Sequence, residues 1–221
     1  GLNKMGAKIN LKNNGIIKID GVNSLTQATH KIMSDRIVAG TFVIAAVMLN
    51  KKFEVKEIIS SNLEALTSLL IKMGAKLKIK KTSIQIMPSK KLNGIKIQTA
   101  PYPGFPTDLQ AQIMALMSLA NGNSQIKENI FENRFMHVPE LNRLGANIKV
   151  KKDIAFISGN RNLKGAQVMA SDLRASVSLV LAALCAEGES VINRVYHLDR
   201  GYEKIEHTLG SLGPSIKREK Y

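Results

Sequence analysis

The sequence has one cysteine, no long apolar run and few acidic residues, and each shortage limits what the chain can be. A single thiol, Cys185, cannot form an internal disulfide, so we expect a reducing, cytoplasmic compartment. The longest apolar run, residues 42–49, is far shorter than the roughly 20 residues that span a bilayer, so we expect no membrane association. The four histidines lack metal-ligand spacing, and no P-loop or dinucleotide fingerprint is present. We therefore expect neither a metal nor a cofactor.

Basic residues outnumber acidic ones by 32 to 17, which gives a formal net charge of +15. Such a charge favours anionic partners: nucleic acid, anionic lipid or a phosphorylated small substrate. Lysines exceed arginines by 24 to 8 and are scattered, without an arginine-rich tract or a nucleic-acid-binding motif. A nucleic-acid partner is thus unlikely on sequence grounds, although a basic polyanion-binding module without catalysis remains an alternative function.

Three stretches of the chain begin alike, with Ser or Thr followed by Asp and then an apolar helix, at Ser34, Thr107 and Ser171. Each continues through a turn, a short strand and an amphipathic helix that ends near Gly74, Gly145 or Gly213. An alternating strand follows, predicted at residues 76–80, 147–151 and 215–219. This internal repetition predicts a three-repeat domain over residues 34–221, with repeats at about 34–106, 107–170 and 171–221.

The first helix of each repeat is apolar on nearly all sides, whereas the strands are half polar. A helix that is apolar all round is buried, so the pattern predicts an α+β fold with helices inside and sheets outside. Residues 5–11 match the last part of a repeat. We therefore expect residues 1–33 to be the last strands of an N-terminal domain that is mostly missing, and the chain to be part of something longer.

The second repeat starts with a proline-rich segment, residues 99–106, that leads directly into Thr107-Asp108 and a buried helix. Pro101, Pro103 and Pro106 keep this segment extended, and Gly104 permits one bend. The segment therefore delivers the Asp108 carboxylate to a helix N-terminus. One interpretation is that Asp108 only caps the helix, which would contribute roughly 0.5–2 kcal/mol. The other is that it carries chemistry.

Three further segments are unusually polar: residues 130–140 with Glu132 and Arg134, the pair Asp172 and Arg174, and residues 196–203 with Arg200. Equivalent loops of a threefold arrangement gather at one end, so the three arginines are expected to converge with Asp108. Arginine forks suit carboxylates and phosphates. The structural alternative is arginine–carboxylate pairing between repeats.

At these residues the sequence resembles the UDP-N-acetylglucosamine enolpyruvyl (1-carboxyvinyl) transferases, the MurA family. The likeness is carried by residues 99–112, by Phe131-Glu-Asn-Arg-Phe-Met-His-Val-Pro-Glu-Leu141, by residues 170–184 and by residues 196–203, and it extends over essentially the whole chain. The resemblance implies an inside-out α/β barrel, or prism, of the EPSP synthase-like superfamily. An EPSP synthase-like enolpyruvyl transferase is a second alternative.

The resemblance also implies an activity: transfer of the enolpyruvyl group of phosphoenolpyruvate to the 3′-hydroxyl of UDP-N-acetylglucosamine, the first committed step of peptidoglycan biosynthesis. By position, Asp108 resembles the proposed general base that contacts the sugar hydroxyl. Ile130 resembles a residue whose backbone contacts the nucleotide sugar, and Arg200 resembles an arginine that meets phosphoenolpyruvate. The candidates near the site with less certain roles are Glu132, Arg134, Asp172 and Arg174.

The sequence departs from the family by lacking its N-terminal Lys-Asn pair and its catalytic-cysteine loop, and Cys185 does not match that loop. The chain corresponds to the C-terminal half of the family. We therefore expect it to supply one wall of the site and to be inactive without the missing N-terminal half.

Overall fold

The computed structural model describes residues 1–13, 15–159 and 162–219, and the chain divides into two compact units, 1–33 and 34–221. The first unit contains a 3-10 turn and one antiparallel hairpin. Its elements are η1 (Leu2–Met5), β1 (Lys8–Leu11) and β2 (Ile17–Asp20). Both hairpin strands are largely exposed, including Leu11, Ile17 and Ile19.

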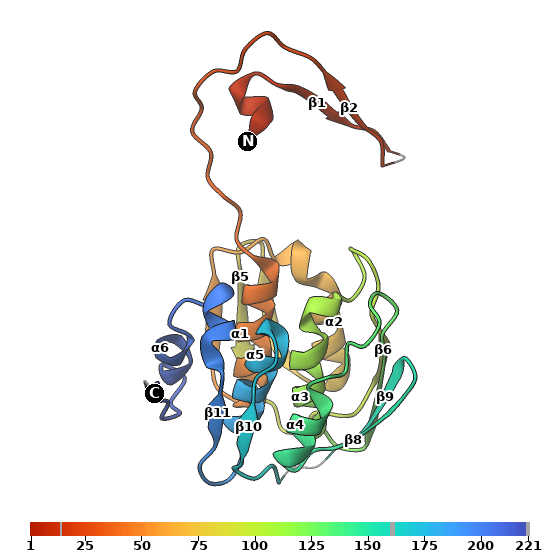
Figure 1. The fold of residues 1–221 in the computed structure, drawn as a ribbon, viewed down its shortest axis with the longest axis vertical. Helices are drawn as coiled ribbons and strands as arrows, with labels where there is room; N and C mark the ends of the chain where they lie inside the picture. Colours follow the sequence, from red (N-terminus) through yellow and green to blue (C-terminus); the bar gives the residue numbers. More distant parts are fainter. Residues whose placement is uncertain (14, 160–161, 220–221) are drawn as a thin grey trace. The chain divides into compact units, whose positions relative to one another are not determined.

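Three buried helices form the centre of the second unit: α1 (Arg36–Met48), α3 (Gln110–Leu119) and α5 (Leu173–Ala183). Helix α3 packs against both α1 and α5, as Figure 1 shows in the middle of the unit. Nine of the ten residues of α3 are buried, including Gln110, Gln112 and Ser118. The prediction that the first helix of each repeat lies inside the domain is therefore confirmed.

Short sheets surround these helices. The first is antiparallel with the order β3 (Phe53–Lys56), β5 (Ser83–Met87), β4 (Lys76–Lys80). The second has the order β6 (Lys96–Gln98), β7 (Asn123–Lys127), β9 (Ile154–Ser158), β8 (Asn147–Lys151), and only its β6–β7 pair is parallel. The third is a parallel pair, β10 (Gln167–Met169) and β11 (Val191–Asn193). Along β9, Ala155 and Ile157 are buried while Phe156 between them is exposed, so one face of the strand joins the core.

An outer helix completes each repeat. These are α2 (Glu64–Met73, after η2, Ser60–Leu63), α4 (Val138–Arg143) and α6 (Ile205–Gly210, after η4, Val195–Arg200). Gly74 ends α2 with a φ of 105°, and a Cβ there would lie 2.9 Å from the carbonyl oxygen of Lys91. The left-handed backbone and the close approach both require glycine at this position.

The strand predicted at residues 215–219 is wrong. Those residues form no ladder, and within the described residues β10 and β11 pair only with each other. In the first two repeats the corresponding strands β4 and β8 each pair with a returning strand, β5 or β9. An alternating pattern forms a strand only where a neighbour satisfies its backbone groups, and no described strand pairs with residues 215–219.

Candidate functional site

The Asp residues at the starts of α1 and α5 are helix caps. The Asp35 carboxylate accepts hydrogen bonds from the backbone N–H groups of Ile37 and Val38. The Asp172 carboxylate accepts from the N–H groups of Arg174 and Ala175, at 2.8 and 3.0 Å. These bonds satisfy donors that the first turn of a helix leaves unpaired, so both side chains act locally.

Asp108 occupies the same position of the second repeat but does not cap its helix. Residues Thr107–Leu109 form the 3-10 turn η3, whose cap has no side-chain hydrogen bond, and α3 begins only at Gln110. The Asp108 Oδ1 atom instead lies 3.1 Å from a terminal nitrogen of Arg134 and 2.5 Å from one of Arg174. The interpretation of Asp108 as a cap is therefore wrong, because its carboxylate is paired with one arginine of its own repeat and one of the third repeat.

The proline-rich segment reaches this position through a compact turn. The Ala100 N–H donates to the Phe105 carbonyl at 2.9 Å, and the Gly104 N–H donates to the Pro101 carbonyl at 2.7 Å. A Cβ at Gly104 would lie 2.6 Å from the Cβ of Ala100, so the turn closes only around glycine. Phe105 is buried in the core and fixes the segment to the domain.

A buried carboxylate, Glu128, joins this segment to the junction that follows β7. Glu128 is 4% exposed and accepts hydrogen bonds from the hydroxyls of Thr99 (2.7 Å) and Thr107 (3.0 Å). It also accepts from the backbone N–H of Ile130 at 2.9 Å. The Ile130 N–H is thus already bonded within the protein.

The two arginines lie in a polar environment at the domain surface. The exposed fractions of the Asp108, Arg134 and Arg174 side chains are 32%, 26% and 36%, so solvent or a ligand reaches the cluster. The Arg134 guanidinium also lies over the ring of Phe131, 5.0 Å from its centroid. Two guanidinium groups on one carboxylate leave an excess positive charge, which favours anions.

Two titratable groups beside the arginines have shifted pKa values. Burial lowers the pKa of His137 to about 4, with Arg134 adding to the effect and Asp172 opposing it. Burial opposes ionisation of Asp172, but hydrogen bonds from Ala175, Arg174 and Ser171 outweigh it and hold the pKa of Asp172 below its ordinary value. The histidine is therefore neutral near pH 7, and Nε2 of its ring has no partner within the described chain.

The starts of the three inner helices lie at one end of the domain. Besides the Asp108–Arg174 pair between α3 and α5, the amide of Gln112 in α3 donates to Thr41 Oγ1 in α1 at 3.2 Å. The Thr41 hydroxyl is also hydrogen-bonded to Tyr202 Oη, at 2.8 Å. Tyr202 follows η4, so the segment with Arg200 reaches this end as well.

The predicted residues are only partly brought together. Arg134 and Arg174 contact Asp108 as expected, and Asp172 lies close by as a cap. Arg200 and Glu132 are exposed, and neither makes an ion pair with another described residue. The expected convergence of Arg200 with Asp108 therefore stays a prediction.

Sequence reasoning missed Glu128, His137 and the Thr41–Gln112–Tyr202 network. Glu128 follows an alternating strand and is indistinguishable there from an exposed glutamate. The only available signal was the pair Thr99 and Thr107 on either side of the prolines. Gln112 offered a clearer one, since it is a polar residue at the start of a largely apolar helix.

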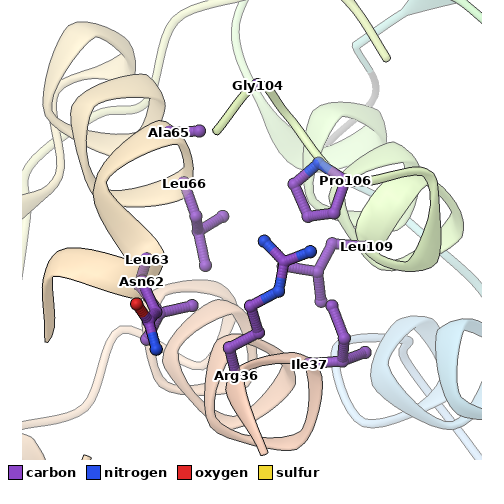
Figure 2. Close-up of a pocket in the computed structure, with 9 residues that line it drawn as sticks. All are labelled: Arg36, Ile37, Asn62, Leu63, Ala65, Leu66, Gly104, Pro106 and Leu109. Carbon is purple, nitrogen blue, oxygen red and sulfur yellow. The ribbon is translucent and has the colours of Figure 1, made fainter. Parts of the chain in front are cut away.

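A small, partly open pocket lies next to this site, between the start of α1, α2 and the proline-rich segment. Figure 2 shows the Arg36 guanidinium directed into it, between Leu66, Pro106 and Leu109. Arg36 also lies over the Tyr102 ring, 4.9 Å from its centroid. Asp108 does not line the pocket, although Pro106 and Leu109 on either side of it do.

Over the part of the chain that the structure describes, no three His, Cys, Asp or Glu side chains are grouped to hold a metal ion, and no helix is long and apolar enough to cross a membrane. Burial raises the pKa of Cys185 to about 12. Its thiol is therefore protonated near neutral pH and is unreactive, and the residue lies in the turn that follows α5.

Comparison with known proteins identifies the family. The sequence matches the family described as EPSP synthase (3-phosphoshikimate 1-carboxyvinyltransferase) over residues 1–209. The chain belongs to the EPSP synthase family. Among solved structures, the enolpyruvyl transferase NikO from Streptomyces tendae superposes on 97% of the chain with a TM-score of 0.88 and 26% identity, over 52% of its own length. The EPSP synthase from Acinetobacter baumannii, at 17% identity and a TM-score of 0.79, shares the fold.

More similar family members are named UDP-N-acetylglucosamine 1-carboxyvinyltransferase. The protein of that name from Pelagibacter ubique is 51% identical over 97% of this chain and 51% of its own length. The one from Bdellovibrio bacteriovorus is 52% identical over 98% of this chain and 53% of its own length. The chain thus spans about half the length of these relatives.

Proposed function

We propose that this chain supplies one wall of an active site that transfers the enolpyruvyl group of phosphoenolpyruvate to the 3′-hydroxyl of UDP-N-acetylglucosamine. The observation that carries the proposal is the partly exposed Asp108 carboxylate, which is not used as a cap and is held by Arg134 and Arg174 where the inner helices begin. Relatives about 50% identical are named for this reaction, and they support the choice of substrates.

Asp108 is suited to the sugar hydroxyl. In the transfer, the hydroxyl oxygen forms a bond to the enolpyruvyl carbon and loses its proton, while the bond from that carbon to the phosphate oxygen breaks. A carboxylate within hydrogen-bond reach of the hydroxyl orients it and accepts the proton. Oδ1 contacts both arginines, whereas no ion pair in the described structure uses Oδ2 of Asp108. We assign that oxygen to the hydroxyl.

Arg134 and Arg174 are suited to the anionic substrate. Phosphoenolpyruvate carries a phosphate and a carboxylate, both of which match the planar fork of a guanidinium. A bound anion competes with Asp108 for the two arginines and leaves that carboxylate better able to accept a hydrogen bond. Arg200, exposed and without an ion-pair partner in the described part of the chain, would add a third positive charge from η4.

We further propose that the opposite wall comes from a domain equivalent to the rest of the longer relatives, and that residues 1–33 belong to it. The family members in question are about twice as long as this chain. Charge interactions at half-exposed side chains are weak in water, and a second domain would exclude that water. Residues 34–221 alone would then bind the nucleotide sugar weakly and catalyse no transfer.

Two measurements on the purified chain test the proposal. Binding of UDP-N-acetylglucosamine is compared with binding of UDP by NMR, with Asp108→Asn as the matched variant. Phosphate release from phosphoenolpyruvate is then measured with the chain alone and with an added N-terminal half of a relative. Selective binding that Asp108→Asn abolishes, and activity only on mixing, are expected. Tight binding to DNA at physiological salt without sugar-nucleotide binding would instead support the basic polyanion-binding module.

A further inference from the structure

Glu128 is a buried carboxylate that the proposed reaction does not use. It has no ion-pair partner among the described residues, yet four neutral groups donate to it. The Thr99 hydroxyl and the Ile130 and Phe131 N–H groups donate to Oε1, the last at 3.4 Å, and the Thr107 hydroxyl donates to Oε2. An ionised carboxylate is costly to bury unless its oxygens are hydrogen-bonded, and here both are.

The donors lie on the two segments that form the candidate site. Thr99 and Thr107 bracket the proline-rich segment, and Thr107 immediately precedes Asp108. Ile130 and Phe131 begin the segment that carries Arg134. A second link supports this junction, because Asn129 donates from its backbone to Thr99 Oγ1 at 2.9 Å and from its side chain to the Thr99 carbonyl at 3.2 Å.

The equivalent positions of the other repeats do not have this arrangement. Glu57 follows β3 and Arg194 follows β11, just as Glu128 follows β7, but both are exposed and have left-handed backbone, with φ of 58° and 60°. Glu128 does not adopt a positive φ, and its side chain is buried. An inward carboxylate is therefore particular to the repeat that contains Asp108.

We propose that Glu128 is a positioning residue that fixes Asp108 relative to Arg134 and to the backbone of Ile130. Its Oε2 holds the residue before Asp108, and its Oε1 holds the start of the segment that ends at Arg134. Charge-assisted hydrogen bonds make this connection stronger than neutral ones would. The catalytic consequence rests on the proposed function, but the positioning itself does not.

The variants are chosen to separate positioning from general stability. Glu128→Ala removes all four acceptor contacts. Glu128→Gln keeps the shape, an oxygen for Thr99 and Ile130, and an amide that donates to the Thr107 hydroxyl. Glu54→Ala is the matched control, because Glu54 also accepts a hydrogen bond from a hydroxyl, that of Ser83 at 2.8 Å, but lies within β3 of the first sheet.

The first readout is hydrogen exchange of the Arg134 guanidinium with water, measured by NMR on the full chain. Glu128 does not contact that group, so a change reports its position against Asp108. We expect exchange to be at least fivefold faster in Glu128→Ala, and within twofold of the natural chain in Glu128→Gln and Glu54→Ala. Unchanged exchange in Glu128→Ala overturns the proposal. If Glu128→Ala does not fold, Thr107→Val, which removes only the Oε2 contact, is held to the same criterion.

The second readout is turnover in the chain combined with the N-terminal half of a relative. A displacement of about 1 Å costs on the order of 100-fold in rate, so Glu128→Ala should lower kcat by 10- to 100-fold and Glu128→Gln should restore it. Combined with Asp108→Asn, Glu128→Ala should lower kcat by less than a further threefold, because it acts through Asp108. Additive losses overturn the proposal. No turnover with any variant, while Arg134 exchange still depends on Glu128, refutes the proposed function and leaves positioning supported.

Discussion

The helix starts at Thr107-Asp108 and Ser171-Asp172 have the same residue types in the same place of their repeats, but their carboxylates have different partners. Asp172, like Asp35, accepts two backbone N–H groups of its own helix. Asp108 pairs with arginines from two other segments, because the 3-10 turn η3 precedes α3 and turns its side chain away from the helix. The repeated motif thus caps a helix in the first and third repeats, whereas in the second repeat its carboxylate is paired with arginines.

The difference has a local cause in the residues before each Asp. Pro106 takes the N-cap position of η3 with extended backbone, and the Thr107 hydroxyl is bonded to Glu128 rather than to the helix. Before Asp172, the Ser171 hydroxyl instead donates to the Asp172 carboxylate itself, at 3.3 Å. The proline-rich segment and Glu128 therefore distinguish the second repeat from the two in which the Asp side chain caps its helix.

The largest expected effect concerns turnover. In a two-domain form of the protein, Asp108→Ala should lower kcat by about 10²–10⁴-fold, the usual contribution of a positioned general base. Its free energy of unfolding should change by at most about 1 kcal/mol, because ion pairs at half-exposed sites contribute little. Steady-state kinetics and urea denaturation check the two halves of the prediction. Near-normal turnover would remove Asp108 from the mechanism.

The next effect concerns the pH dependence of stability, through the buried His137. The folded-state pKa of His137, about 4, is below the ordinary 6.5, so the unfolded chain binds the extra proton first. Stability is therefore complete above pH 6.5 and is lost as pH falls towards 4, by roughly 3 kcal/mol over that interval at 1.36 kcal/mol per pH unit.

Urea denaturation at pH 7, 5.5 and 4.5 measures this loss. His137→Phe should remove the part of the pH dependence that lies between 6.5 and 4, and the exposed His207→Gln should leave it unchanged. The lowered pKa of Asp172 adds a loss of the same sign only at more acidic pH, below its ordinary value of 3.8. A flat profile between pH 7 and 4.5 would contradict the neutral, buried state of His137.

A smaller effect sharpens the comparison between caps. Asp35→Ala and Asp172→Ala should each lower the free energy of unfolding by about 0.5–2 kcal/mol, and the matching Asn variants should recover most of it. Thermal denaturation of the six variants with Ala or Asn at positions 35, 108 and 172 provides the measurement. Asp108→Ala costing as much as the other two would mean that its carboxylate also stabilises the helix start.

Much of the fold could be predicted from the sequence because the same pattern of Ser/Thr-Asp starts and apolar runs recurs in each repeat. The apolar run of α3 indicates burial on all sides, and the Ser/Thr-Asp starts locate the helices to within a few residues. The strand predicted at residues 215–219 failed because alternation describes one face of a strand and not whether a neighbour is present. Strand formation at that point depends on residues far away in the sequence.

The site was less predictable, for a related reason. Motif position identified Asp108, Arg134 and Arg174, since arginine and carboxylate at equivalent loops suggest proximity. Sequence could not tell an Asp that caps its helix from one that pairs with arginines, because that depends on the backbone of the preceding residue. Nor could it distinguish the inward Glu128 from the outward Glu57, which follow similar strands but differ in φ. Tertiary structure decides both.

The smallest expected effect addresses the arginines themselves. Arg134 and Arg174 contact the same Asp108 oxygen, but their side chains are 26% and 36% exposed, so each pair should stabilise the fold by less than about 1 kcal/mol. Arg134→Lys and Arg174→Lys should therefore unfold at nearly the natural urea concentration. Both should nevertheless weaken binding of phosphoenolpyruvate in the two-domain form, because an ammonium group cannot reproduce the two-pronged contact of a guanidinium with phosphate. Arg143→Lys on α4, whose ion pair with Glu140 lies outside the cluster, is the control that should change neither quantity. The opposite result would be that Arg134→Lys and Arg174→Lys lower the free energy of unfolding as much as the loss of a cap does, while phosphoenolpyruvate binding is unchanged. The Asp108 cluster would then stabilise the packing of the repeats, and the second repeat would not differ in role from its neighbours.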